Sequence, residues 1–275
     1  MTTSTLTPEA ISYVCTTVRN RSAIELDNSK TYLIETRLAP VAKQNGFASI
    51  DELIQAVKNT GRRGLESQLV EAMTTNETSF FRDLHPFEAL RKTVLPAIRT
   101  KNAALKSLNI WSAACSTGQE IYSVAMHIRE HFPERASWKV QLIGTDLSDE
   151  VLAKAKAAKF TQFEVNRGLP AALLVKHFQR QGTLWELCPE IRNMATFTTL
   201  NLIERWPAMP RMDIVFLRNV LIYFAPETKR MILENIRKVM APQGVLFLGA
   251  AETTMGLDAH FERIQSDNGV FYRLK

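Results

Sequence analysis

The chain has few cysteines, no long apolar run and no leader-like start. Its three cysteines, Cys15, Cys115 and Cys188, lie far apart and not at the spacing of metal ligands, which favours reduced thiols and no metal site. No stretch approaches the roughly eighteen apolar residues of a membrane span. Met1 to Pro8 lacks the basic start and apolar run of a signal peptide. We therefore expect a cytoplasmic protein without metal and without direct membrane insertion.

Glycine is scarce where a phosphate-binding loop would need it. Residues 109–126 predict a buried strand, a turn of small residues and the start of a helix, and the turn Ala114–Gly118 contains glycine only at Gly118. A dinucleotide fingerprint needs three glycines spaced around a pyrophosphate. Nicotinamide or flavin binding therefore loses most of its support. The small residues still let a ligand approach the backbone, which favours a nucleoside-like cofactor without phosphates.

The charge excess is not gathered into a basic run. Lys and Arg number 34 against 28 Asp and Glu, a formal net charge of +6, and the excess is spread along all 275 residues. A nucleic-acid surface is expected only if folding collects these charges on one face, and an acidic protein partner is equally compatible. The hydrophobic share of 45% is enough for a buried core in one large domain or two.

The first third of the chain has the pattern of short helices separated by turns. Leu33, Ile34, Leu38 and Val41 form one apolar stripe at helical spacing, and Asn45-Gly46 would end that helix. We expect a small helical domain with helices at residues 8–19, 30–44, 51–59 and 65–73.

From about Pro86 strands and helices alternate, as is typical of a parallel sheet covered on both faces. Ser148 is expected to cap a helix that begins at Asp149. Residues 162–176 suggest a loop and a helix, and residues 178–193 a small antiparallel hairpin that turns near Gln181-Gly182. The expected strands are 108–113, 139–145, 195–199, 212–217, 244–249 and 269–274, and the expected helices between them are 120–132, 149–158 and 226–240.

Polar residues follow two of the expected strands. Asp146 ends the second strand, where an acid can accept both hydroxyls of a ribose, or can simply cap the next helix. Arg218 and Asn219 follow the apolar run 212–217, at the strand end where open α/β sheets bind ligands. Tyr223 could point into the same site if the chain turns helically, or could pack between helix and sheet with its hydroxyl in solvent.

A further polar segment lies before the sheet domain. Asn76, Thr78 and Arg82 can present an amide, a hydroxyl and a guanidinium to one ligand. The alternative is an ordinary capped linker in which Arg82 pairs with Asp83, and the local pattern alone favours it.

Four motifs in register resemble the chemotaxis receptor methyltransferase (CheR) family. They are Asn-Glu-Thr-Ser-Phe-Phe-Arg, Ala-Cys-Ser-Thr-Gly-Gln-Glu-Ile-Tyr-Ser, Gly-Thr-Asp-Leu-Ser and Arg-Asn-Val-Leu-Ile-Tyr-Phe, followed by Leu-Gly-Ala-Ala-Glu at 248–252. The resemblance implies an α/β fold of the class I methyltransferases, a Rossmann-like, mostly parallel seven-stranded sheet. It also implies an all-α N-terminal domain at 1–72, a linker at 73–85, a catalytic domain at 86–275 and an antiparallel β-subdomain inserted at about 178–194.

The resemblance implies methyl transfer from S-adenosylmethionine to glutamate side chains on the cytoplasmic helices of chemoreceptors, which gives glutamyl methyl esters. Arg82 and Tyr223 match the positions suspected of a part in methyl transfer. By similarity, Asn76, Thr78 and Arg82 close over the methionine end of the cofactor, Glu120 lies near its polar groups and Asp146 takes the ribose. The remaining positions expected to bind the cofactor are Gly118 in the turn, Asn201 and Leu202 beside the adenine, and Leu217, Arg218 and Asn219 along the other wall.

The resemblance also suggests how the substrate docks. Lys30 and Arg37 share a face of the second expected helix and could steer an acidic receptor helix, although a solvated face explains them about as well. Some family members bind a tethering peptide through an enlarged hairpin. The short turn from Gln179 to Thr183 makes that mode doubtful here and favours direct recognition of the methylation helices.

Two other functions stay in view. A nucleic-acid methyltransferase would suit the positive charge, but amino-directed enzymes need a polar-Pro-Pro-aromatic step where this chain has Arg218-Asn219-Val220-Leu221. We therefore expect no nucleic-acid partner. A regulatory module that binds the cofactor without catalysis is disfavoured by the presence of both Arg82 and Tyr223.

Overall fold

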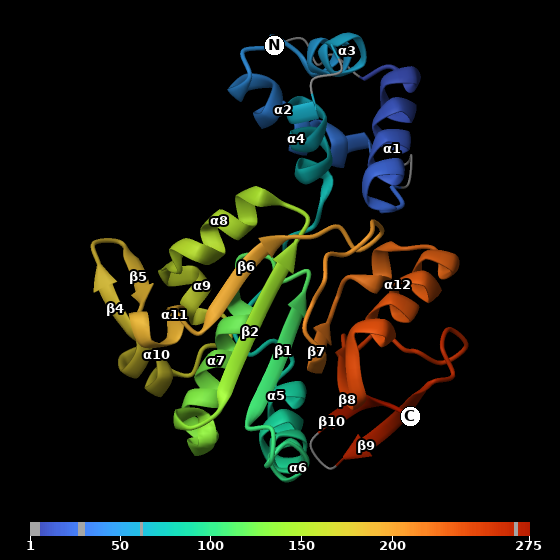
Figure 1. Ribbon diagram of the computed structural model, residues 1–275. Coiled ribbons are helices and arrows are strands. Elements are labelled where there is room, and N and C mark those ends of the chain that lie inside the picture. Colours follow the sequence, from blue (N-terminus) through green and yellow to red (C-terminus); the bar gives the residue numbers. More distant parts are fainter. Residues whose placement is uncertain (1–5, 27–30, 61–62, 267–268) are drawn as a thin grey trace. The chain divides into compact units, whose positions relative to one another are not determined.

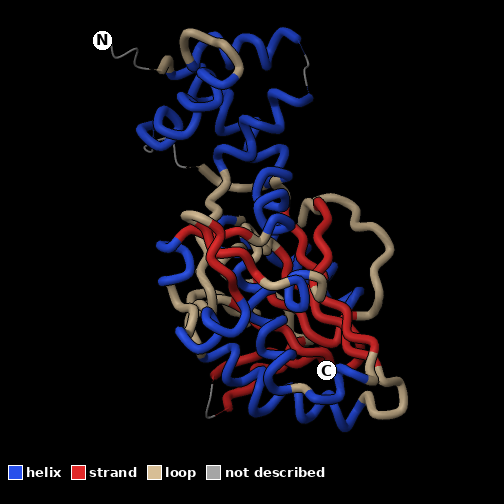
Figure 2. Tube along the Cα trace, turned by 90° about the vertical axis from the view of Figure 1, so that its left-hand side faces the viewer, coloured by secondary structure: helices blue, strands red, loops and turns tan. Residues whose placement is uncertain are grey.

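A computed structural model describes residues 6–26, 31–60, 63–266 and 269–275, and the chain divides into two compact units (Figure 1). The first unit contains Met1–Thr75 together with Tyr223–Thr228. The second contains Asn76–Ile222 and Lys229–Lys275. Figure 2 shows helices and loops in the described part of the first unit, whereas the second unit also contains strands.

The first unit is all-α, as the sequence predicts. Its helices are α1 (Pro8–Ser22), α2 (Thr31–Gln44), α3 (Ile50–Thr60) and α4 (Arg63–Met73). Thr7 caps α1 by accepting a hydrogen bond from the Ala10 amide at 3.2 Å. The apolar faces meet in a core whose fully buried members are Val14, Val18, Ile34, Leu38, Leu53, Ile54 and Leu69. The second expected helix included Lys30, which lies outside the described residues.

The second unit contains the expected seven-stranded sheet. Its strand order is β6-β2-β1-β7-β8-β10-β9, and β10 runs antiparallel to both of its neighbours. The other pairings in the sheet are parallel. The strands are β1 (Ser107–Ala113), β2 (Lys139–Asp146), β6 (Ala195–Thr199), β7 (Met212–Leu217), β8 (Met240–Leu248), β9 (Phe261–Ser266) and β10 (Gly269–Leu274).

Two details of the sheet differ from the sequence analysis. Strand β9 was missed because it lies at the edge of the sheet, where a polar segment with only Phe261 fully buried is tolerated. Strand β8 begins at Met240, although a turn was expected at Pro242–Gly244. The pairing of β7 with β8 is irregular between Met212 and Ile214, and such an irregularity accommodates a proline within a strand.

Helices connect the strands of the second unit. Ser148 caps α8, as expected, by accepting a hydrogen bond from the Val151 amide at 3.3 Å. Trp111, Phe216 and Phe247 are completely buried, so the middle of the sheet is the core. The helical segments are α5 (His85–Ala89), a π-helical turn (Leu90–Val94), α6 (Leu95–Lys101), α7 (Gln119–His131), α8 (Asp149–Ala157), α9 (Gln162–Asn166), α10 (Ala171–His177), α11 (Pro189–Arg192) and α12 (Pro226–Val239), with 3₁₀ turns at Pro133–Ala136 and Leu221–Tyr223.

A second, antiparallel sheet confirms the expected hairpin and extends it. Strands β4 (Phe178–Gln181) and β5 (Leu184–Leu187) form the hairpin, with Gly182 at a φ of 62° in its turn. Strand β3 (Lys159–Thr161), which was not predicted from the sequence, pairs with β5 and gives the order β3-β5-β4. Three residues are too short to show an alternating pattern.

Within the described ranges, none of the helices combines the length and the apolarity needed to cross a bilayer.

Candidate functional site

The carboxyl ends of three strands meet where the strand order reverses. Strand β1 lies between β2 and β7, and Ala113 at its end is in register with Thr145 and with Leu217. Segments that follow these strands therefore emerge at one edge of the sheet. Open α/β sheets bind their ligands at such a reversal.

The turn after β1 has an unusual backbone. Ala114, Ser116 and Gly118 have φ angles of 57°, 51° and 92°. A Cβ atom on Gly118 would lie 3.1 Å from the Cβ of Ala155 and from the ring of Tyr122. A side chain here would therefore press on Ala155 and Tyr122, and the φ angle of 92° independently favours glycine.

Asp146 is fixed by two main-chain amides. Its Oδ2 accepts from the Ser116 amide at 2.9 Å and its Oδ1 from the Ser148 amide at 3.1 Å, and only 7% of the residue is exposed. The cap of α8 is Ser148, so the interpretation of Asp146 as the helix cap is wrong. Because a carboxylate oxygen can accept more than one hydrogen bond, this rigid group suits the two hydroxyls of a ribose.

Cys115, in the same turn, is not an activated nucleophile. Burial, and next the negative charge of Asp146, raise the pKa of its thiol well above the usual value. The thiol is therefore protonated near neutral pH and contributes packing rather than covalent chemistry.

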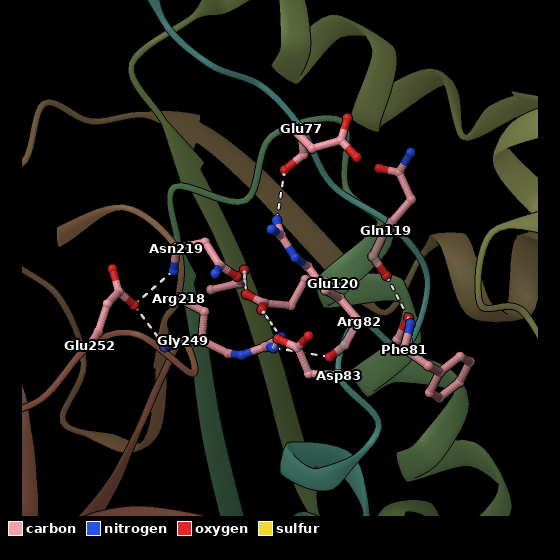
Figure 3. Close-up of polar contacts among 12 residues, drawn as sticks. Glu77, Phe81, Arg82, Asp83, Gln119, Glu120, Arg218, Asn219, Gly249 and Glu252 are labelled. Atoms are coloured by element: carbon pink, nitrogen blue, oxygen red, sulfur yellow. Dashed lines mark hydrogen bonds and ion pairs between the residues drawn. The ribbon is translucent and has the colours of Figure 1, made fainter. Parts of the chain in front are cut away.

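Arg218 connects three segments of the site (Figure 3). Its Nη1 donates to Glu120 Oε2 at 2.9 Å, and its Nη2 donates to Asp83 Oδ2 at 2.6 Å and to the Arg82 carbonyl at 2.9 Å. The side chain is only 1% exposed. Glu120 also accepts a hydrogen bond from Ser112 Oγ at 2.8 Å. The end of β7, the start of α7 and the segment before Pro86 are thus held together by one buried cation.

Arg82 has a different partner from the one that the linker interpretation gave it. Its Nη1 donates to the Glu77 carbonyl at 3.0 Å, while Asp83 pairs with Arg218. The Glu77 carboxylate binds Arg167, and this hydrogen bond lowers the pKa of Glu77. The alternative interpretation, an Arg82–Asp83 pair in an ordinary linker, is therefore wrong.

The backbone around Arg82 is strained. Phe81, Asp83 and Leu84 have φ angles of 47°, 68° and 45°, a conformation that costs on the order of 1 kcal/mol or more for each such residue. The strain is sustained by surrounding contacts. Among them, the Phe81 amide donates to Ser123 Oγ at 2.9 Å. Strain that the fold holds in this way is typical of functional sites.

Residues Asn76 and Thr78 begin the same segment. The Asn76 carbonyl accepts a hydrogen bond from Ser116 Oγ at 2.8 Å, which joins the segment to the turn after β1. Both residues line a cavity of about 630 Å³, together with Thr117 and Gln119.

Glu252 was missed as a site residue by the sequence analysis. Its Oε2 accepts from the amides of Gly249 and Asn219 at 2.7 and 2.8 Å (Figure 3). Its Oε1 accepts from the amides of Val220 and Ile222 at 2.9 and 3.3 Å. One carboxylate thereby holds the loops after β7 and β8, including Asn219 at a φ of 58°. An acid soon after the end of a strand, as with Asp146, is the signal that could have found it.

The remaining predicted residues of the second unit are Leu217, Leu202 and Asn201. Leu217 is fully buried at the end of β7, and Leu202 is 7% exposed after β6. Asn201 accepts from the Ile203 amide at 3.3 Å and donates to Glu204 Oε1 at 3.1 Å. The contacts thus form two sets: one contains Asn76, Ser116 and Asp146, and the other contains Arg82, Glu120 and Arg218. Asn219 is held by Glu252.

Two predicted residues belong to the first unit. Arg37 donates from Nη1 to the carbonyls of Met73 and Thr74, both at 2.8 Å, so its guanidinium binds the carboxyl end of α4. The Tyr223 carbonyl accepts a hydrogen bond from the Glu25 amide at 3.2 Å. Lys30, the other expected docking residue, lies outside the described residues.

The residues at the sheet edge fit S-adenosylmethionine. Glu120 and Asp146 supply acceptors beside a turn, 114–120, that contains no lysine or arginine. This set suits a nucleoside that carries a positive charge and hydroxyls, not phosphates. Among the residues described, no group of three or more histidine, cysteine or acidic side chains could hold a metal ion. Strand order and site together define a class I S-adenosylmethionine-dependent methyltransferase.

Comparison with known proteins gives the family. Residues 76–270 match "CheR methyltransferase, SAM binding domain", and residues 9–74 match "CheR methyltransferase, all-alpha domain". The chain belongs to the CheR methyltransferase family, as its four motifs indicated. Its cofactor is S-adenosylmethionine.

Related proteins match nearly the whole chain. It is 42% identical to chemotaxis protein methyltransferase 1 of Pseudomonas aeruginosa, over 92% of this chain and 93% of that protein. It is 40% identical to chemotaxis protein methyltransferase Cher2 of Pseudomonas putida, over 92% and 93%. It is 34% identical to chemotaxis protein methyltransferase 1 of Vibrio cholerae, over 100% of both chains.

Proposed function

We propose that this methyltransferase transfers methyl groups to the γ-carboxylates of specific glutamates on the cytoplasmic helices of chemoreceptors, forming glutamyl methyl esters in chemotaxis adaptation. The names of its relatives support chemotaxis as the setting. The observation that carries the proposal is the buried Arg218, which joins the strained segment at Arg82 and Asp83 to Glu120 at the cofactor edge.

The acceptor needs no general base. A glutamate carboxyl group has an unperturbed pKa of about 4.3, so it is already an anion near pH 7. Bound S-adenosylmethionine supplies an electrophilic methyl group on a positively charged sulfur. A bond forms from carboxylate oxygen to carbon as the sulfur–carbon bond breaks, and both charges disappear. The protein therefore acts chiefly by excluding water and by holding oxygen, carbon and sulfur in line.

Arg82 should contact the acceptor only partly. A full bidentate pair would stabilise the attacking carboxylate more than the charge-dispersed transition state and would slow transfer. Its hydrogen bond to the Glu77 carbonyl engages one arm of the guanidinium, which supports the limited role. We assign Arg82 to the cofactor carboxylate or to one oxygen of the acceptor.

The cofactor contacts follow the strand ends. Asp146 would bind the ribose hydroxyls, since its two oxygens are already oriented by main-chain amides. Glu120 would lie near the polar groups of the methionine part. The other residues assigned to the cofactor are Asn76, Thr78, Gly118, Asn201, Leu202, Leu217, Arg218 and Asn219.

Tyr223 is assigned to orienting the acceptor through a neutral hydrogen bond. We expect Tyr223→Phe to lower kcat about tenfold, the loss of one hydrogen bond of about 1.4 kcal/mol in the transition state, and to leave the Kd for S-adenosylmethionine unchanged. Tyr13→Phe in α1 is the matched control. Initial rates and calorimetric binding measure the two effects, and an unchanged turnover of Tyr223→Phe would refute the assignment.

Docking is proposed to be direct. Acidic receptor helices would be steered by positive charge on the first unit, with Lys30 and Arg37 as the candidates. The guanidinium of Arg37 donates to two neutral carbonyls, and these hydrogen bonds do not neutralise its positive charge. The short β4–β5 turn, which joins Gln181 to Leu184, supports direct recognition over binding of a tethering peptide.

The proposal is tested by incubating the protein with S-adenosylmethionine labelled in the methyl group and a purified chemoreceptor cytoplasmic fragment, followed by mild alkali. Carboxyl methyl esters release volatile labelled methanol, and this release is the expected result. Label that remains on the fragment after alkali would indicate N-methylation. Either that outcome or no transfer at all would contradict the proposed function.

A further inference from the structure

Gly168 lies against the segment that carries Arg82. It is in the turn between α9 and α10 and has a φ of 84°. A Cβ atom on Gly168 would collide with the carbonyl oxygen of Phe80, far inside the 3.0 Å that such atoms keep, and would lie 3.2 Å from the carbonyl carbon. Only a residue without a side chain allows the two segments to approach this closely.

The amide of the same peptide group is held as well. The carbonyl of Phe80 and the amide of Phe81 belong to one peptide, and in a trans peptide they point in opposite directions. The Phe81 amide donates to Ser123 Oγ at 2.9 Å. Ser123 is completely buried in α7, and its hydroxyl donates to the Gln119 carbonyl at 2.7 Å. The peptide is therefore confined from both sides, by Gly168 and by Ser123.

The ring of Phe80 is anchored in the antiparallel sheet. It is completely buried, and its centroid lies 5.0 Å from that of Phe160 in β3 and 5.7 Å from that of Phe178 in β4. Both pairs have the edge-to-face geometry that aromatic rings prefer. A displaced Phe80 carbonyl would therefore turn the peptide about a fixed ring, since the residue cannot move away as a whole.

The turn at Gly168 is anchored on both sides. Val165 is only 1% exposed, and Leu169 packs against the core of the second unit. The Arg167 guanidinium forms an ion pair with the Glu77 carboxylate on the opposing segment. A methyl group at position 168 would therefore displace the opposing carbonyl, because the turn itself is not free to withdraw.

We infer that Gly168 is a positioning residue for Arg82, which comes directly after Phe81. The φ of Phe81, 47°, depends on the orientation of the peptide group before it. A rotation of that peptide changes the direction in which the Arg82 side chain leaves the backbone. In Figure 3 this side chain extends to the Glu77 carbonyl, which accepts its hydrogen bond. The inference rests on the proposed function, which assigns Arg82 to the reaction.

The experiment compares Gly168→Ala with Gly182→Ala in the full chain. Gly182, in the β4–β5 turn, has a φ of 62°, but a Cβ there would meet no atom of the described residues within 4 Å apart from its chain neighbours. Both variants therefore carry a similar backbone penalty, and only Gly168→Ala adds the collision.

The rate of methyl transfer is measured with labelled S-adenosylmethionine and the receptor fragment. We expect Gly168→Ala to lower kcat at least about tenfold, because misplacing a reacting group by about 1 Å can cost about a hundredfold. Gly182→Ala should keep kcat within about twofold of wild type, since its strain affects stability and not the position of Arg82.

Two further measurements separate positioning from a general loss of structure. In a protein that already carries Arg82→Ala, adding Gly168→Ala should change kcat by less than about twofold, because the guanidinium that it misplaces is absent. Hydrogen exchange of the Phe81 amide, followed by NMR, should be at least about tenfold faster in Gly168→Ala and unchanged in Gly182→Ala.

If Gly168→Ala does not fold, Ser123→Ala takes its place. This variant frees the amide end of the same peptide and should lower kcat about fivefold or more. Its matched control is Ser22→Ala, because Ser22 in α1 is also buried and its hydroxyl also donates at 2.7 Å to a carbonyl four positions earlier, that of Val18. A wild-type kcat in folded Ser123→Ala would overturn the inference.

The outcomes distinguish the inference from the proposed function. A wild-type protein that releases no labelled methanol would contradict the proposed function and this inference with it. If wild type forms esters, equal kcat values for Gly168→Ala and Gly182→Ala would overturn the inference alone. An undiminished effect in the Arg82→Ala protein, or unchanged exchange of the Phe81 amide, would overturn it in the same way.

Discussion

Replacing Arg218 with methionine should destabilise the second unit by about 3 kcal/mol. The guanidinium is 1% exposed and binds Glu120 and Asp83, whose side chains are 12% and 40% exposed. Removing one member of a buried ion network leaves uncompensated charge and costs roughly 3–5 kcal/mol, and the exposure of Asp83 places the expected value at the lower end. The free energy of unfolding, measured in urea at pH 7, gives the loss directly.

An exposed arginine provides the comparison for this measurement. Arg273→Met removes a surface ion pair with Glu262, both side chains being 47% exposed, and should change the free energy of unfolding by less than about 1 kcal/mol. If Arg218→Met were no less stable than Arg273→Met, the network would not hold the three segments together.

Replacing Glu252 with glutamine should lower kcat/KM about a hundredfold. Glutamine keeps the size of the side chain but replaces one carboxylate oxygen with an NH₂ group, which would face main-chain amides that themselves donate. Two of the four hydrogen bonds to Gly249, Asn219, Val220 and Ile222 would be lost. The loop from Asn219 would then move, and a shift of about 1 Å in a reacting site can cost about a hundredfold in rate.

Glu262→Gln, on the exposed pair with Arg273, is the control for Glu252→Gln. Initial rates of methanol release give kcat and KM, and thermal unfolding reports whether the variant stays folded. We expect kcat to fall much further than any loss of folded protein, judged from the change in melting temperature, would explain. Wild-type rates in a folded Glu252→Gln variant would show that the carboxylate does not position the loop.

Much of the second unit could be predicted because its signals are local. The strand, small-residue turn and helix from β1 to α7 are contiguous, and Asp146 follows directly on an apolar strand. The hairpin of β4 and β5 was predicted from the turn near Gln181-Gly182. Strand β9 could not be predicted, because an edge strand is only partly buried and its polar residues interrupt the alternation of apolar and polar side chains.

The pairing of charges could not be predicted in this way. The alternative interpretation of the linker paired Asp83 with its neighbour Arg82, but Asp83 binds Arg218, 135 positions along the chain. Glu252 stood in a recognised motif without a role, because nothing in its neighbourhood indicates that it accepts hydrogen bonds from amides more than thirty positions earlier, such as those of Val220 and Asn219.

From its sequence alone, this chain was identifiable as a helical unit followed by a mostly parallel sheet, with polar residues at the strand ends and a cofactor that carries no phosphate. These features depend on periodicity and on short motifs, which act over a few residues. Only the tertiary structure decided that Arg218 is the buried centre of the site and that Glu252 holds two loops. Such contacts join segments far apart in the chain, and their partners are selected by burial and geometry once the sheet has formed.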